Sequence, residues 1–115
     1  MLNPRGPWQY TGTVLLLVGR RCASSNESFI AAMRELPHVT LVGDRTAGST
    51  ASPGTFPLAN GCSYTVSRWI EYTADNQVIE DLGISPRVFV PSGPGDFAQG
   101  RDPVLDWALA ARAFP

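Results

Sequence analysis

The pattern of apolar residues in the first part of the chain predicts two buried strands joined by a helix. Thr13–Val18 is a continuous run of β-branched and aliphatic residues, which is typical of a strand buried on both faces of a parallel sheet. Over Asn26–Leu36 the apolar residues recur at helical spacing, and Pro37 ends the pattern. Val39–Val42 is a second short apolar run. Such a unit forms a crossover, and open α/β sheets bind ligands at the carboxyl ends of their strands.

The middle of the chain is predicted to be a loop followed by an antiparallel hairpin. Residues 43–54 are rich in Gly, Ser, Thr and Pro, which favours a surface loop of the kind that often borders a functional site. Thr55–Ala59 and Cys62–Arg68 then flank Asn60-Gly61, a dipeptide that accepts the two positive φ angles of a tight hairpin turn.

The last part of the chain combines short strands with a C-terminal helix. Trp69–Thr73 and Gln77–Ile79 are expected to pair, and Ile84–Val90 is a further strand whose Pro86 favours a start near a sheet edge. Asp102 followed by proline is a strong helix start. The expected buried stripe of that helix is Val104, Leu105, Ala108 and Leu109. The prediction is an α/β fold with a strand-helix-strand unit, antiparallel hairpins and a C-terminal helix.

Length and charge exclude several classes of protein. The 115 residues fit one domain, which we place at 10–115 after a lead-in over 1–9. A formal net charge of −1 without a run of like charges gives no attraction to nucleic acid or to an anionic membrane. The longest apolar run, Val14–Val18, is far shorter than the ~20 residues that span a bilayer. With two cysteines and one histidine, we expect neither a metal site nor a cofactor.

Ser24 lies between the first strand and the helix and has two interpretations. Ser24 and Glu27 have the spacing of a capping box, in which the side chain of each residue accepts the backbone N–H of the other. Such a cap would stabilise the helix by ~1 kcal/mol. Alternatively, the Ser24 hydroxyl is a nucleophile. The free amides and the positive dipole end of the helix would then stabilise an oxyanion, with the Ser25 N–H as one donor.

Four separate segments resemble one family in order and spacing. They are Ser24–Glu27, Thr40–Gly48, Ile79–Pro86 and Gly100–Leu105. Together they resemble the second half of the catalytic domain of tail-specific (C-terminal processing) serine peptidases, over Tyr10–Ala111. The resemblance implies a Clp protease/crotonase-like sheet, an incomplete domain, and a nucleophile that opens a helix.

The resemblance also implies which residues form the active site. Bacterial members use a lysine as base, but Ser49 occupies the matching position and the chain has no lysine. Because a serine hydroxyl is not basic near neutral pH, the tricorn-like version remains, in which a histidine is the base and a second serine and a glutamate orient it. Glu80 matches that glutamate, and Gly48 and Ser49 are expected to bind substrate.

The histidine and the second serine of that site are expected in a preceding segment that this chain does not contain. His38 is no substitute, because it follows the helix and lies ~20 Å from Ser24 along the helix axis. Asp81 beside Glu80 does not form a paired-carboxylate site, because neighbours on a strand point to opposite faces. Asp44 and Arg45 either border the substrate cleft or form a solvated pair.

The function predicted from the sequence is therefore that of a serine endopeptidase portion that forms an acyl-enzyme at Ser24. We expect the 115 residues alone to be inactive on their peptide or protein substrates. The alternatives are a non-enzymatic binding or interaction domain, since one fold serves many functions, and an inactive fragment of the same fold. An incomplete domain would expose one side of its sheet, so we also expect self-association.

Overall fold

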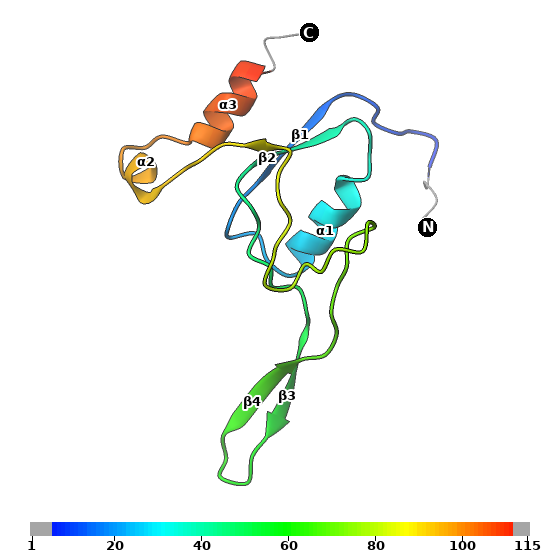
Figure 1. Ribbon diagram of the computed structural model, residues 1–115, viewed down its shortest axis with the longest axis vertical. Helices are drawn as coiled ribbons and strands as arrows, with labels where there is room; N and C mark the ends of the chain where they lie inside the picture. Colours follow the sequence, from blue (N-terminus) through cyan, green and yellow to red (C-terminus); the bar gives the residue numbers. More distant parts are fainter. Residues whose placement is uncertain (1–5, 112–115) are drawn as a thin grey trace.

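The computed structural model describes residues 6–111 and contains one parallel and one antiparallel sheet (Figure 1). In the parallel sheet β1 (Val14–Val18) pairs with β2 (Val39–Gly43), and β2 pairs with β5 (Val88–Phe89). The helix α1 (Ser25–Met33) connects β1 to β2, which confirms the predicted strand-helix-strand unit and the α/β class. Residues 1–5 of the predicted lead-in and 112–115 of the predicted domain lie outside the described part.

The main core lies between α1 and one face of the parallel sheet. Its buried residues are Val18, Ile30, Leu41, Ile79 and Ile84. The C-terminal helix α3 (Pro103–Ala111) contacts β1 and β2, and Figure 1 shows it on the other side of the sheet from α1. Gly43 permits a close approach there, because a Cβ at this position would lie 2.1 Å from the Val18 carbonyl oxygen and 3.3 Å from Val104.

Two predictions of burial are wrong. The first strand is not buried on both faces, since Leu17 is 38% exposed; β1 is an edge strand that α3 covers only in part. On α3, Leu105 and Leu109 are 43% and 57% exposed, so of the predicted stripe only Ala108 is fully buried. The predicted start of this helix is right, because Asp102 Oδ1 accepts the Leu105 N–H at 3.0 Å.

The predicted hairpin is present as the antiparallel pair β3 (Pro53–Pro57) and β4 (Ser63–Ser67). It extends away from the rest of the molecule as an arm (Figure 1). Its loop is longer than the two residues expected, because the Leu58 N–H to Cys62 carbonyl bond closes it around Gly61, whose φ is +84°.

The remaining expected strands are shorter than predicted. The pairing of Trp69–Thr73 with Gln77–Ile79 is reduced to one antiparallel bridge between Tyr72 and Val78. Of Ile84–Val90 only β5 joins the sheet, at its edge. A short helix, α2 (Pro94–Ala98), precedes α3 and was not predicted. No helix within residues 6–111 is long and apolar enough to cross a membrane.

Candidate active site

Ser24 is exposed on the turn that leads from β1 into α1, and its backbone is strained. Its φ of 58° and ψ of −129° lie in a region that residues with a Cβ rarely adopt. A helix-capping serine needs extended backbone angles so that its oxygen reaches the first turn. Ser24 makes no side-chain capping hydrogen bond, so the capping-box interpretation is wrong. Its hydroxyl remains available for chemistry.

The amino end of α1 provides a hydrogen-bond donor beside Ser24. The Ser24 carbonyl accepts the Glu27 N–H at 2.8 Å, and the Ala23 carbonyl accepts the Asn26 N–H at 3.2 Å. No residue within 6–111 accepts the Ser25 N–H. This amide is one of the unpaired donors at a helix start, where the helix dipole also favours negative charge.

Glu27 is fully buried and holds the loop after β2 against α1. Its two carboxylate oxygens accept the Thr46 hydroxyl, the Gly48 N–H at 2.7 Å and the Ser49 N–H at 2.8 Å. Thr46 in turn accepts the Ile84 N–H at 2.7 Å. A buried carboxylate is stable only when its oxygens are well hydrogen-bonded, and this network meets that requirement.

The importance of Glu27 was missed in the sequence analysis, although one signal was present. Glu27 precedes Ile30 by three residues, so both lie on one face of α1, and Ile30 belongs to the core. An acidic residue on the buried face of a short helix needs polar partners inside the protein. The small polar loop after β2 is the segment that supplies them.

The loop held by Glu27 contacts the Ser24 segment directly. The Ala47 N–H donates to the Cys22 carbonyl at 2.9 Å, and the Ser24 N–H donates to the Ser49 carbonyl at 2.7 Å. The Ser49 position predicted to contact substrate is exposed beside Ser24.

Gly48, the other predicted substrate contact, lies inside the protein. It is buried, its N–H binds Glu27, and its carbonyl accepts the Asp81 N–H at 2.8 Å. Its φ is +74°, and a Cβ there would lie 2.7 Å from the Gly83 nitrogen. A role in substrate contact does not fit this geometry, because both backbone groups are already used. Gly48 instead allows two loops to pack closely.

Glu80 is half-buried and accepts three hydrogen bonds through one oxygen. Its Oε2 accepts the Thr50 N–H and the Thr50 hydroxyl, each at 3.0 Å, and the Ala51 N–H at 3.3 Å. The Thr50 backbone bond, followed by the Thr50 hydroxyl bond, lowers the pKa of Glu80 below its ordinary value of 4.5. The other oxygen, Oε1, has no donor among residues 6–111 and can accept one.

A single peptide group connects Ser24 with Glu80. The carbonyl of Ser49 accepts from the Ser24 N–H, and the N–H of Thr50, in the same peptide group, donates to Glu80. Standard peptide dimensions and these two bonds keep the Ser24 nitrogen within about 8 Å of the Glu80 carboxylate. The structure therefore brings together the two residues that the sequence analysis placed at one site.

The expected strand position of Glu80 and Asp81 is wrong. Both lie in a turn, and Asp81 has a φ of +63°. The Asp81 backbone binds the Gly48 carbonyl, and its side chain is exposed without a hydrogen bond among the described residues. Strand alternation therefore does not determine where these two carboxylates point.

His38 is far from Ser24, as expected. Its carbonyl accepts the Val14 N–H, at the end of β1 opposite to Val18, from which the chain continues to Ser24. A five-residue strand separates the two ends by about 13 Å. No group of three or more metal-ligating side chains occurs in the described ranges.

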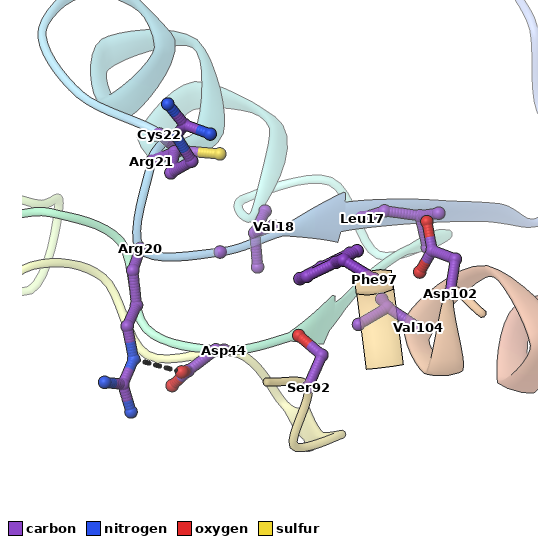
Figure 2. Close-up of a pocket in the computed structure, with 11 residues that line it drawn as sticks. Leu17, Val18, Arg20, Arg21, Cys22, Asp44, Ser92, Phe97, Asp102 and Val104 are labelled. Carbon is purple, nitrogen blue, oxygen red and sulfur yellow. Dashed lines mark hydrogen bonds and ion pairs between the residues drawn. The ribbon is translucent and has the colours of Figure 1, made fainter. Parts of the chain in front are cut away.

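A pocket of about 340 Å³ lies at the carboxyl ends of β1 and β2, on the α3 side of the sheet (Figure 2). Phe97, Leu17 and Val104 form apolar walls, and Arg20 is hydrogen-bonded to Asp44 at its edge. This hydrogen bond is the main cause that lowers the pKa of Asp44. The solvated pair of Asp44 with Arg45 considered from the sequence is not formed, because Asp44 pairs with Arg20 and Arg45 binds Asp44 through its backbone N–H.

Comparisons with known proteins agree on one family. The sequence model of peptidase family S41 matches residues 3–90. Tricorn protease homolog 1 of Streptomyces coelicolor is 32% identical over 111 residues, which are 93% of this chain and 10% of that relative. A solved structure of a candidate peptidase from Parabacteroides merdae is 31% identical with a TM-score of 0.83, over 96% of this chain and 35% of that one.

The crystal structure of the tricorn protease shares the fold. It has a TM-score of 0.73 at 24% identity, and the match covers 87% of this chain and 10% of that one. The chain therefore spans a minor part of the length of each of these proteins.

Replacing Glu27 by Gln tests the buried network. The amide group would face donors, and at least one backbone N–H would lose its acceptor, so we expect the free energy of unfolding to fall by about 3 kcal/mol. Urea denaturation measures this, with Glu35→Gln as control. Glu35 is an exposed acid just after the same helix, and its replacement should change stability by no more than about 0.5 kcal/mol. Equal effects of the two substitutions would contradict the proposed network.

Proposed function

Because this chain belongs to peptidase family S41, we propose that it carries the nucleophile-bearing part of a serine peptidase active site. The observation that supports this most directly is the exposed Ser24 hydroxyl, held on a strained turn at the start of α1 beside the free Ser25 N–H. Strained turns that lead from a strand into a helix expose catalytic serines in other hydrolases.

In the proposed reaction Ser24 forms an acyl-enzyme. The Ser24 Oγ attacks a peptide carbonyl carbon as its proton passes to a base, and the Ser25 N–H donates to the oxyanion that forms. The carbon–nitrogen bond then breaks, and the proton is delivered to the leaving amine. Water next attacks the ester, which releases the second product and restores the Ser24 hydroxyl.

The base in this proposal is a histidine from sequence outside these 115 residues. A lysine base is not available within the chain, and His38 lies at the wrong end of the sheet. The free Oε1 of Glu80 is the group that would accept an imidazole N–H, either directly or through a second serine. An ionised carboxylate in this place fixes the imidazole tautomer and stabilises the imidazolium.

The proposal also includes the type of peptidase and the class of its substrates. We assign the complete protein to endopeptidases of the tail-specific type, in the tricorn-like branch, acting on peptide or protein substrates. The chain alone should not turn over peptides, because within residues 6–111 neither a histidine nor a lysine lies near Ser24 to act as the base.

Replacing Ser24 by Ala in a polypeptide that also contains the histidine segment should abolish peptide cleavage. We expect a loss of about 10⁴-fold or more in kcat, since the nucleophile itself is removed. The matched control is Ser25→Ala, which changes the neighbouring hydroxyl but keeps the N–H donor, and it should remain active. Full activity of the Ser24 variant, measured with a fluorogenic peptide, would rule out this nucleophile.

Glu80→Gln should lower kcat by about 100-fold or more and leave KM almost unchanged, because the carboxylate acts on the base and not on substrate binding. The lowered pKa keeps Glu80 ionised until the pH falls below 4.5, so the deficit should be constant across neutral and mildly acidic pH. Asp81→Asn, an exposed neighbour, is the control. If Glu80→Gln kept the rate of the parent enzyme, a binding domain of the same fold would be the better account.

A further inference from the structure

The hairpin arm formed by β3 and β4 has one apolar face. Side chains that share this face come from alternate positions of the two strands, and the rings of Phe56 and Tyr64 stack with their centroids 5.4 Å apart. Phe56, Leu58, Tyr64 and Val66 are between 44% and 49% exposed. A two-stranded hairpin is at best marginally stable by itself, so an arm with a half-exposed apolar face gains stability from additional strands.

The two edges of the arm differ in their hydrogen-bonding groups. The Leu58–Cys62 pair is hydrogen-bonded, and hydrogen-bonded pairs alternate with pairs whose backbone groups point outward. On β3 the outward positions are 53, 55 and 57, of which Pro53 and Pro57 have no N–H. Prolines at an edge prevent pairing with a further strand, so the outer edge of β3 is blocked.

The outer edge of β4 is open. Its outward positions are Ser63, Thr65 and Ser67, each with an N–H and a carbonyl group. No residue within 6–111 pairs with these groups, because β4 has β3 as its one neighbour in the sheet. Exposed edges of this kind are templates for a further strand.

We propose that β4 of one chain pairs with β4 of a second copy in antiparallel orientation, on a two-fold axis at Thr65. In this arrangement Thr65 faces Thr65 of the copy, Ser63 faces Ser67, and all outward groups are hydrogen-bonded. Tyr64 then lies opposite Val66 of the copy, an aromatic and β-branched pair that favours strand pairing. The result is a four-stranded sheet whose apolar faces are on the same side.

Charge favours a second copy as the occupant of this edge. Residues 46–67 contain no charged side chain, so two copies do not repel each other there and nothing selects a charged partner. A two-fold axis also makes the contact closed, as in most homodimers, because each edge is used once. The proposal does not depend on the peptidase function, since it concerns the arm and not Ser24.

The test compares the same substitution on the two edges. Thr65→Pro removes an outward N–H from β4, and Thr55→Pro removes the outward N–H of the residue directly opposite on β3. Neither N–H is used within the hairpin. Sedimentation of the full chain over a wide range of concentrations should give a dimer for the parent chain and for Thr55→Pro. The Thr65→Pro chain should be a monomer at the same concentrations.

A crosslink keeps the test decisive if the Thr65→Pro hairpin does not fold. Residues facing each other in a hydrogen-bonded pair are about 5.5 Å apart at Cα, within disulfide range. With Cys22 and Cys62 replaced by Ser, Thr65→Cys should therefore form a disulfide-linked dimer under mild oxidation, whereas Thr55→Cys should not. A monomeric parent chain, or equal crosslinking of the two variants, would overturn the proposal.

Discussion

The arrangement of the candidate site depends on the buried carboxylate of Glu27. Its bonds to Thr46, Gly48 and Ser49 join the first turn of α1 to the loop after β2. Charge-assisted bonds in a site without solvent are stronger than neutral ones, and an unpaired charge there would be very unfavourable. The loop is therefore fixed relative to the helix, and the positions of Ser24 and Glu80 follow from it.

The same loop explains how a strained residue is maintained. The turn that carries Ser24 lies between β1 and α1, which hold its two ends. In addition, the Ser24 N–H donates to the Ser49 carbonyl, which attaches the turn to the loop after β2. Unfavourable backbone angles persist only where the surroundings determine them in this way, and they are frequent at functional sites. Glu80 is positioned by the next N–H along the loop, that of Thr50. Nucleophile and carboxylate are thus placed by one rigid segment.

Much of this could be predicted from the sequence because the signals are local. Apolar runs identified β1 and β2, Asp102 identified the start of α3, and four segments in order identified the peptidase family. The role of Glu27 could not be predicted from its spacing to Ser24, since a capping box and a buried carboxylate have the same spacing. The prediction that Glu80 and Asp81 lie on a strand was likewise wrong. The Asp81 N–H donates to the carbonyl of Gly48, a residue far away in the sequence, and local patterns cannot reveal such a contact.

The most direct test of the account is to map the residue modified by a fluorophosphonate. In a polypeptide that joins these residues to the histidine segment, mass spectrometry should find the adduct on Ser24, and on the isolated chain little adduct should form. An adduct on Ser25, Ser28 or Ser49 instead, or peptide cleavage that continues without any modification of Ser24, would contradict it.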